Sequence, residues 1–374
     1  MILLRNVPTW APAPLGPRDV VLAGGKIEAV GHDLRVPADL PVTVVDGAEL
    51  RLVPGLVDAH VHIGGGGGEG GAHTRVPPQT AAQFLSAGVT TVVGLLGTDT
   101  VTRTMADLLA VARGLEHHGL TALCYTGGYT VPPTTLTGSA RADLVHVDRI
   151  VAIGETAISD HRSSQPSFEA LAALAADAHV AGLMTGKAGL LHLHLGDGPR
   201  GLAMVRRALD ELELPPRVWH PTHVNRRRAL WREAMELAAR GLVCDLTAFP
   251  APWEPGEVPP AEALAEWHTK GLPWEQLTMS SDGGGCLPSF DADGVLLHMD
   301  VGRSHTLLQA VFAAEELGVP FERGLATVTS NVARQFRLPT KGRIAPGLDA
   351  DVVLLRRDGA VARVWAGGRE VWAA

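Results

Sequence analysis

Short apolar runs alternate along most of the chain with longer stretches whose apolar positions recur at helical spacing. Residues Met105–His118 and Phe168–His179 show the helical pattern most clearly. This alternation predicts repeated β/α units around a parallel sheet that is buried on both faces. The candidate strands are Leu56–His62, Thr90–Leu96, Ala122–Thr126, Ile150–Ile158, Leu190–Leu195, Val218–His223, Leu242–Thr247 and Thr278–Asp282. Such a series predicts an α/β fold of the (β/α)₈ TIM-barrel type, in which catalytic residues gather at the carboxyl ends of the strands.

Both chain ends show another pattern, in which short strand-like runs are separated by turns. Near the N-terminus a Gly-Gly turn separates Val20–Ala23 from Lys26–Val30, and near the C-terminus another separates Ala360–Ala366 from Val371–Trp372. Further strand candidates are Val42–Val45 and Asp351–Leu355. We therefore predict that residues 1–53 and 343–374 form one small β-sandwich domain, and that residues 54–342 form the barrel.

The composition excludes several kinds of partner. Hydrophobic residues make up 46% of the 374 residues and charged residues 19%, which is enough apolar material for a large core. The formal net charge is -8 and basic residues cluster only at Arg226–Arg228, so we expect no nucleic-acid partner. The apolar run before Arg5 is too short for a signal peptide, and no run approaches the roughly 20 apolar residues of a membrane span. The three cysteines lack CxxC spacing, which favours a reducing compartment, and we expect a cytoplasmic protein.

Histidines and one aspartate stand at the carboxyl ends of the predicted strands. His60 and His62 end the first strand two residues apart, so their imidazoles point to the same side. A lone HxH pair is equally consistent with packing, but His194, His223 and Asp282 end the fifth, sixth and eighth strands. Imidazole nitrogens and carboxylate oxygens are ligands of zinc or a similar divalent ion. The pattern therefore predicts a metal site at this end of the barrel.

Two of these histidines have a neighbour that competes for the same role. His192 shares a strand face with His194, and we expect it to pack beside the ligand or to support it. His220 and His223 are three residues apart and are not expected to face inward together on a regular strand. We choose His194 and His223 as ligands because they lie nearer the strand ends.

The ligand pattern resembles that of the amidohydrolase superfamily, which combines HxH on the first strand with histidines on the fifth and sixth and an aspartate on the eighth. The resemblance covers nearly the whole chain, and Lys341–Asp351 is similar to the segment that returns such chains to their small sheet domain. Within the superfamily the chain resembles the isoaspartyl (β-aspartyl) dipeptidases in several local strings. These strings are Gly65–Glu69, Val92–Asp99, Ala157–Arg162, Pro221–Arg226 and Ser280–Gly283.

The resemblance implies how these strings would bind a dipeptide. Glu69 would bind the α-ammonium of the substrate, and Gly67 and Thr98 would contact its aspartyl carboxylate. Arg162 and Arg226 would bind the carboxylate of the leaving amino acid, because a planar guanidinium matches a carboxylate bidentately. Outside these strings, a surface ion pair would be the preferred interpretation of either arginine.

The resemblance also implies the reaction, which is metal-dependent hydrolysis of the β-aspartyl isopeptide bond by a metal-activated hydroxide. Asp282 would accept the proton of the attacking water and pass it to the leaving amine, and Tyr129 would lie over the scissile carbonyl. An alternative is an amidohydrolase that acts on another amide, such as a cyclic amide or an N-acyl amino acid. A non-catalytic scaffold is a third hypothesis, but its mark would be lost ligands, and all of them are present. Because oligomers are common in the superfamily, we expect a homo-oligomer.

Two positions depart from the superfamily pattern. Binuclear members usually carry a carboxylated lysine on the fourth strand, where this chain has Glu155. We predict two zinc ions bridged by Glu155 and no dependence on bicarbonate, with a single-metal site or a purely structural glutamate as the alternatives. Cys286 stands in the substrate pocket where we expect a serine, and its thiol is a weaker hydrogen-bonding group than a hydroxyl. Substrate preference is therefore less fixed than reaction type, whereas a nucleophilic role for Cys286 is disfavoured because the metal-activated hydroxide already attacks.

Overall fold

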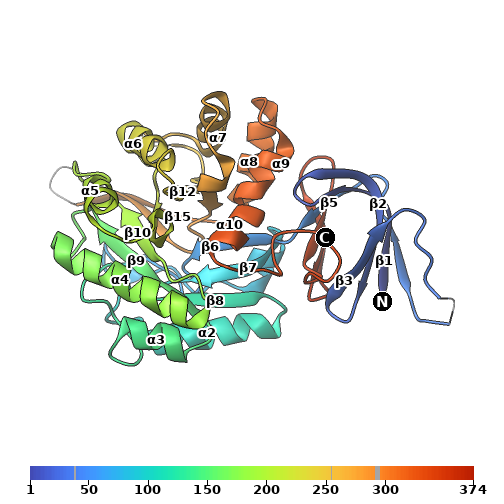
Figure 1. Cartoon of the computed structure of the whole chain (residues 1–374), viewed down its shortest axis with the longest axis horizontal. Coiled ribbons are helices and arrows are strands. Elements are labelled where there is room, and N and C mark those ends of the chain that lie inside the picture. The colour runs from blue at the N-terminus through green and yellow to red at the C-terminus, as the bar shows by residue number, and fades with distance from the viewer. Residues whose placement is uncertain (38, 254, 291–294) are drawn as a thin grey trace.

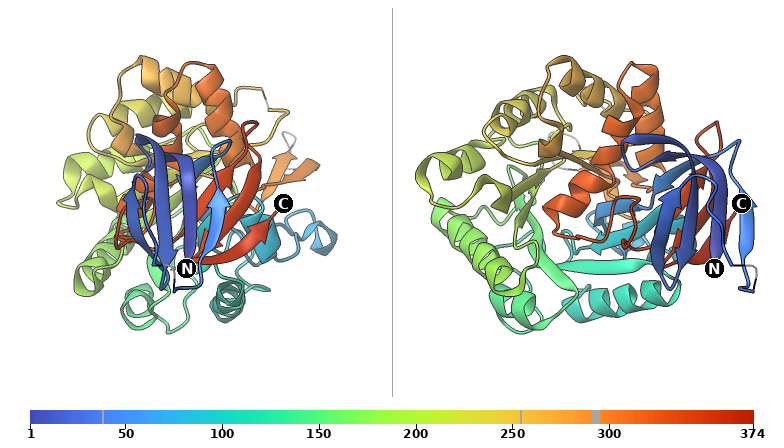
Figure 2. Two further views of the ribbon diagram at one scale, coloured as in Figure 1. Left: turned by 90° about the vertical axis from the view of Figure 1, so that its right-hand side faces the viewer. Right: turned by 45° about the vertical axis from the view of Figure 1, so that its right-hand side comes forward.

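The computed structural model describes residues 1–37, 39–253, 255–290 and 295–374. Figure 1 shows two bodies side by side, a barrel of strands wrapped by helices and a sheet that holds both chain termini. The right-hand view of Figure 2 shows the helices arranged around the ring of barrel strands.

The barrel strands have the sequential order expected of repeated β/α units. They are β6 (Leu56–Val61), β7 (Val89–Gly94), β8 (Thr121–Thr126), β9 (Ile150–Ile158), β10 (Leu191–Leu195), β11 (Trp219–Thr222), β12 (Cys244–Thr247) and β13 (Leu277–Ser280). Strands β6 to β11 form one parallel sheet, and β12 pairs with β13 in parallel. The amide of His62 donates to the carbonyl of Gly283 at 2.8 Å and that of Val224 to the carbonyl of Asp245 at 3.4 Å, which links the two sheets. The eight predicted strands are confirmed, each to within two residues at either end.

Helices cover the outside of the barrel. They are α1 (Ala81–Leu85), α2 (Met105–His117), α3 (Ala140–His146), α4 (Phe168–Thr185), α5 (Ala203–Glu211), α6 (Arg228–Ala238), α7 (Pro260–Thr269), α8 (Thr306–Glu316), α9 (Phe321–Thr327) and α10 (Ser330–Gln335), with 3₁₀ turns η1 (Ala72–Thr74), η2 (Pro216–Val218) and η3 (Trp274–Gln276). The side chain of Ser167 caps α4 by accepting from the amide of Ala170, and the helix ends at left-handed Gly186. The predicted helix Phe168–His179 is thus confirmed and is longer than expected.

Among the helices in the described ranges, α4 alone is long and apolar enough to cross a membrane. Its buried residues pack against the barrel strands, as those of core helices with the same composition do.

The second sheet joins the two chain ends. Its strands are β1 (Ile2–Trp10), β2 (Pro14–Ala23), β3 (Lys26–Gly31), β4 (Thr43–Asp46), β5 (Arg51–Pro54), β16 (Val352–Leu355), β17 (Val361–Ala366) and β18 (Arg369–Ala373). N-terminal β5 pairs antiparallel with C-terminal β16, with Val53 opposite Val353. This sheet has its own buried apolar cluster, which includes Leu4, Leu52 and Trp365. The pairing describes one connected sheet, so the two layers of the predicted sandwich stay a prediction.

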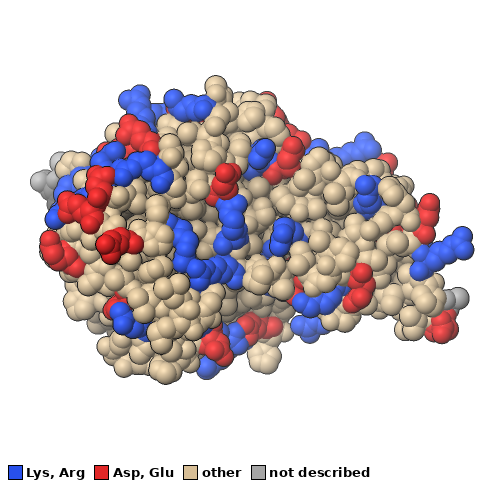
Figure 3. Space-filling view, viewed as in Figure 1, with Lys and Arg blue, Asp and Glu red and all other residues tan. Residues whose placement is uncertain are grey.

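Two further features bear on the site. An antiparallel hairpin, β14 (Cys286–Phe290) and β15 (Leu296–Val301), follows β13 and places Cys286 beside the carboxyl ends of the barrel strands. Val332 of α10 and the adjacent Phe336 pack with Tyr125 and Leu190 in a separate apolar cluster. Tyr125 and Phe336 of this cluster contact the buried rings of His192 and His220, respectively. On the face drawn in Figure 3, basic and acidic side chains are scattered singly or in small groups.

Candidate metal centre and substrate pocket

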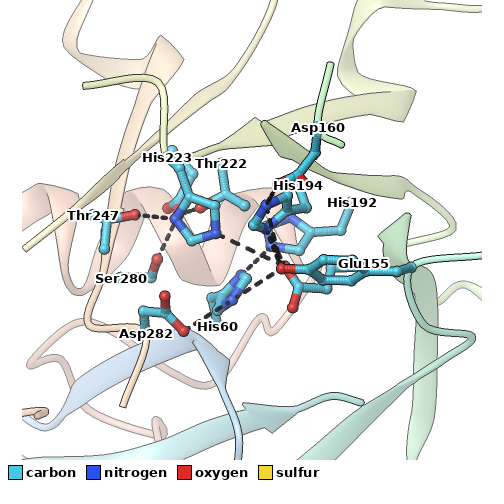
Figure 4. A network of polar contacts seen from close by, with 12 residues as sticks. His60, Glu155, Asp160, His192, His194, Thr222, His223, Thr247, Ser280 and Asp282 are labelled. Atoms are coloured by element: carbon cyan, nitrogen blue, oxygen red, sulfur yellow. Dashed lines mark hydrogen bonds and ion pairs between the residues drawn. The ribbon is translucent and has the colours of Figure 1, made fainter. Parts of the chain in front are cut away.

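Six side chains converge at the carboxyl ends of the barrel strands, and Figure 4 labels five of them, all but His62. Each is at most 7% exposed, although four are imidazoles and two are carboxylates. They are His60 of β6, His62 just after it, Glu155 of β9, His194 of β10, His223 after β11 and Asp282 after β13. The structure thus brings together every residue that the sequence nominated as a ligand.

His223 and Asp282 lie just beyond their strands because their own backbones are left-handed. The φ angles are 58° at His223 and 53° at Asp282, values that are uncommon for residues other than glycine and that cluster at functional sites. The turn at His223 breaks the two-residue alternation of β11, so His220 and His223 both lie buried inside the barrel. The expectation that only one of them faces inward is therefore wrong, because it assumed a regular strand.

Glu155 lies at the centre of the cluster and its two oxygens face different imidazoles. Its Oε1 is 3.4 Å from Nε2 of His62. Its Oε2 is 3.1 Å from Nδ1 of His194, 3.5 Å from Nε2 of His60 and 3.8 Å from Nε2 of His223. Oδ1 of Asp282 lies opposite, 3.4 Å from His60 and 3.3 Å from His62. Both carboxylates are therefore surrounded by the nitrogens that would share an ion with them.

Both carboxylates stay ionised despite their burial. Burial alone would raise the pKa of Glu155, but the neighbouring imidazoles, His60 first, hold that pKa well below its usual range. Burial likewise opposes ionisation of Asp282, and the adjacent imidazoles of His60 and His62 hold its pKa below the usual range. Anionic oxygen is what a divalent cation requires of these side chains.

The donor set fits a divalent metal. Three overlapping groups bring one ligand atom per residue within 4.8 Å of each other, and they are His60-His62-Glu155, His60-His223-Asp282 and Glu155-His194-His223. Nε2 of His60 and Oδ1 of Asp282 face each other, yet neither has a hydrogen-bond partner among the described residues. Buried polar atoms are normally satisfied, so an ion between them would account for this pair.

A pocket opens over this cluster. It is lined by five of the six candidate ligands, His60 being the exception, and by every residue that the sequence nominated for the substrate. Glu69 stands at the rim, where Oε1 accepts from the hydroxyl of Thr98 at 2.8 Å and both oxygens lie 3.3 Å from the thiol of Cys286. Burial raises the pKa of Cys286, so the thiol is a hydrogen-bond donor to Glu69 and not a nucleophile.

The two arginines of the pocket differ in their partners. Arg162 donates from Nε and Nη2 to the two oxygens of Asp160, at 3.0 Å and 2.7 Å, and its Nη1 is 3.4 Å from Glu69. Arg226 lies 5.7 Å from the ring centroid of Phe249 and forms no ion pair with a carboxylate in the described part of the chain. Arg226 therefore retains its full capacity for an anionic ligand, whereas Arg162 is partly engaged.

Tyr129 lies between Arg162 and the metal ligands. Its hydroxyl is 2.9 Å from Nδ1 of His194, and the guanidinium of Arg162 lies 5.4 Å from its ring centroid. Burial raises the pKa of Tyr129 well above its usual value, and nearby Glu155 and Asp160 add to the shift. The hydroxyl therefore keeps its proton and can donate it in a hydrogen bond.

Sequence analysis assigned no role to Asp160 or Arg103, and both shape the pocket. Asp160 orients Arg162 and also lies 2.9 Å from Nε2 of His194. It belongs to the string Ala157–Arg162, which was the available signal for it. Arg103, only 5% exposed, donates to the carbonyls of Gly66 and Gly67 at 2.7 Å and 3.1 Å, and no local pattern marks it. Gly67 itself requires glycine, because its φ is 74° and a Cβ there would lie 2.5 Å from the carbonyl oxygen of Thr74.

We expect Arg103→Met to lower the free energy of unfolding by about 2 kcal/mol or more, because buried loop carbonyls lose a charged donor. Chemical denaturation would measure this change. Arg113→Met, at an exposed position of α2, is the matched control and should shift stability by less than about 0.5 kcal/mol. Equal stability of the two variants would show that the loop does not depend on Arg103.

A parallel barrel that gathers imidazoles and carboxylates at its strand ends is typical of metal-dependent hydrolases. The model of the Amidohydrolase family matches residues 51–371, and the chain belongs to this family. It is similar to a β-aspartyl dipeptidase from Fervidobacterium islandicum AW-1, solved in complex with a β-Asp-Leu dipeptide, at 39% identity and TM-score 0.95 over 100% of this chain and 96% of that one. A second structure of β-aspartyl dipeptidase from the same organism gives 37% identity and TM-score 0.91 over 100% and 97% of the two chains.

Curated relatives match over shorter segments. A dihydroorotase of Lactiplantibacillus plantarum is 33% identical over 89 residues, which are 23% of this chain and 17% of that protein. This match therefore spans less than a fifth of the relative. The resemblance to the superfamily and to the β-aspartyl dipeptidases, predicted from short strings, is confirmed by the full-length comparisons.

Proposed function

We propose that this protein is a metal-dependent β-aspartyl dipeptidase, which hydrolyses the isopeptide bond of isoaspartyl dipeptides. The observation that carries the proposal is the pocket, in which Glu69, Arg162 and Arg226 surround a buried cluster of metal-ligand side chains. Full-length similarity to a dipeptidase solved with a β-Asp-Leu dipeptide supports the same substrate class.

The charges of the pocket complement those of a β-aspartyl dipeptide. Such a substrate carries one ammonium and two carboxylates at neutral pH. Glu69 binds the ammonium, Gly67 and Thr98 contact the aspartyl carboxylate, and Arg226 with Arg162 binds the carboxylate of the leaving residue. An α-linked dipeptide would place its ammonium elsewhere relative to the scissile bond, and the pocket would discriminate against it.

The residues around the scissile bond have separate tasks. A metal held by the histidines, Glu155 and Asp282 would activate water and polarise the scissile carbonyl. Asp282, which is ionised, accepts the proton of the attacking water and passes it to the leaving amine. Tyr129, which burial keeps protonated, donates a hydrogen bond to the carbonyl oxygen as negative charge develops there.

We further propose that the metal is zinc and that two ions bind, with Glu155 in the place of a carboxylated lysine. Support comes from the position of Glu155, because Oε1 faces His62 while Oε2 faces His60, His194 and His223. Glu155 also belongs to two of the three candidate ligand groups. A permanent carboxylate needs no carbon dioxide to form it, so the activity should not depend on bicarbonate.

Hydrolysis of a β-aspartyl dipeptide beside its α-aspartyl isomer, with zinc supplied, tests the substrate class. We expect cleavage of the β isomer alone, and we expect Glu69→Gln to raise KM by at least about tenfold because a charged ammonium loses its anionic partner. Glu316→Gln, at an exposed position of α8, is the matched control and should leave both constants unchanged. Cleavage of neither isomer by zinc-loaded protein would contradict the proposal and redirect the search to cyclic amides and N-acyl amino acids.

The remaining parts of the proposal concern the whole molecule. We propose that residues 54–342 form the catalytic barrel, and that residues 1–53 and 343–374 form a small domain whose sheet folds into a sandwich. We also propose a cytoplasmic homo-oligomer. The sparse cysteines support the compartment, and the oligomeric habit of the superfamily supports self-association.

A further inference from the structure

A continuous chain of hydrogen bonds runs from His60 into the barrel interior. Nδ1 of His60 is 2.7 Å from Nε2 of His192, and Nδ1 of His192 is 2.9 Å from Nδ1 of His220. Nε2 of His220 is 3.1 Å from the hydroxyl of Thr278, which lies 2.6 Å from Oδ1 of Asp245. These contacts join four strands, β6, β10, β11 and β13, to a carboxylate on β12.

The two middle histidines are sealed from water and neutral. His192 and His220 have no exposed surface. The ring of Tyr125 stacks on His192 with 4.9 Å between the ring centroids, and Phe336 lies edge-on to His220 with 5.7 Å between the centroids. Gly154 leaves the space for His192, since a Cβ there would lie 2.7 Å from its Cβ. Without exposed surface, an imidazole is favoured in its uncharged form. Each ring therefore has one donor nitrogen and one acceptor nitrogen.

The position of every proton in this series of hydrogen bonds follows from one requirement at His60, where the series begins. Nε2 of His60 faces Glu155 and Asp282, and it must lack a proton if it binds a metal, so Nδ1 carries the proton and donates to His192. His192 accepts at Nε2 and must then donate from Nδ1 to Nδ1 of His220. His220 in turn donates from Nε2 to Thr278.

The hydroxyl of Thr278 completes the series. It accepts from His220 and donates to Asp245, the nearer of its two acceptors, because the carbonyl of Cys244 is 3.4 Å away. Asp245 is only 1% exposed and also accepts from the hydroxyl of Thr222 at 2.8 Å. A carboxylate that only accepts therefore sets the direction at the inner end. Reversing any one proton would place two donors face to face.

We propose that His192, His220, Thr278 and Asp245 are positioning residues, which we call the inner relay, and that they fix His60 in the tautomer whose Nε2 binds metal. A metal-binding histidine typically donates its other ring N–H to a carboxylate or a carbonyl. Loss of that hydrogen-bond partner weakens metal affinity by about 10- to 100-fold. Here three further groups extend that connection across the barrel. The inner relay rests on the proposed metal site but is independent of the proposed substrate.

Nitrogen-15 NMR of histidine-labelled, zinc-loaded wild-type protein tests the proton positions directly. The expected pattern is a proton on Nδ1 of His60, on Nδ1 of His192 and on Nε2 of His220. A proton on Nδ1 of His220 would overturn the inner relay. This measurement needs no variant and no substrate.

Zinc affinity, measured by competition with a chromophoric chelator, tests the consequence. Thr278→Val keeps the shape but removes the acceptor of His220, and we expect the Kd for zinc to rise about tenfold or more. Thr278→Ser should restore it. Thr91→Val is the matched control, because Thr91 of β7 is equally buried and its hydroxyl has no hydrogen-bond partner among the described residues.

The outcomes separate the two levels of the proposal. Unchanged zinc affinity in Thr278→Val would overturn the inner relay and leave the metal site standing. Wild-type protein that binds no zinc would overturn the metal site and the inner relay together. Hydrolysis of β-aspartyl dipeptides, measured separately, bears on the substrate alone.

Discussion

Replacement of Asp282 by asparagine should lower kcat by about 10²- to 10⁴-fold while KM changes little. Asparagine keeps the shape of the side chain but cannot accept the proton that the attacking water must lose. Steady-state kinetics with a β-aspartyl dipeptide would measure the two constants. The pocket side chains that contact the substrate in our proposal are untouched, which is why the effect should fall on turnover.

Asp282 is also a candidate ligand, so metal content must be measured on the same sample. Excess zinc should restore occupancy in Asp282→Asn without restoring turnover. Asp197→Asn is the matched control, because Asp197 is an exposed carboxylate in the loop after β10 that does not line the pocket. A turnover number that stays at the wild-type level in fully loaded Asp282→Asn would exclude Asp282 as the proton acceptor.

The ligand cluster could be predicted from the sequence because strand geometry is simple. Side chains alternate along a strand, so His60 and His62 had to share a face, and the carboxyl ends of parallel strands had to meet. Asp282 and His223 were found by the same rule, although both lie just beyond regular strand geometry. Their left-handed backbone has no sequence signal here, since neither is a glycine.

Contacts between distant strands could not be predicted in this way. His192 and His220 were recognised as neighbours of ligands, but the hydrogen bond between them depends on the register of β10 and β11. The pairing of Arg162 with Asp160 was not predicted. The resemblance implied a role for Arg162 alone, and no sequence signal marked Asp160 as its partner. Arg103 supports a loop that lies 36 residues earlier in the chain, at Gly67. A local sequence pattern cannot predict a contact over that separation.

The second large effect is expected at Glu155, where glutamine removes the charge and keeps the shape. Zinc-reconstituted wild-type protein should hold about two ions per chain, as in other two-metal sites, and Glu155→Gln about one or fewer. Two divalent ions held close together repel each other, and only anionic ligands between them offset that repulsion. With Glu155 neutral, Asp282 is the sole carboxylate left among the six candidate ligands. Elemental analysis after reconstitution measures the stoichiometry.

Turnover should fall with the second ion in Glu155→Gln, and added bicarbonate should leave both wild-type and variant activity unchanged, because neither protein carries a lysine to be carboxylated at this position. Glu316→Gln serves again as the control for removal of one negative charge from an exposed site. A wild-type stoichiometry near one would contradict the bridging role and assign Glu155 to a single ion. The position of Glu155 argues for two, because its carboxylate faces both the His60–His62 pair and the His194–His223 pair, and a ligand of one ion has no need to face both.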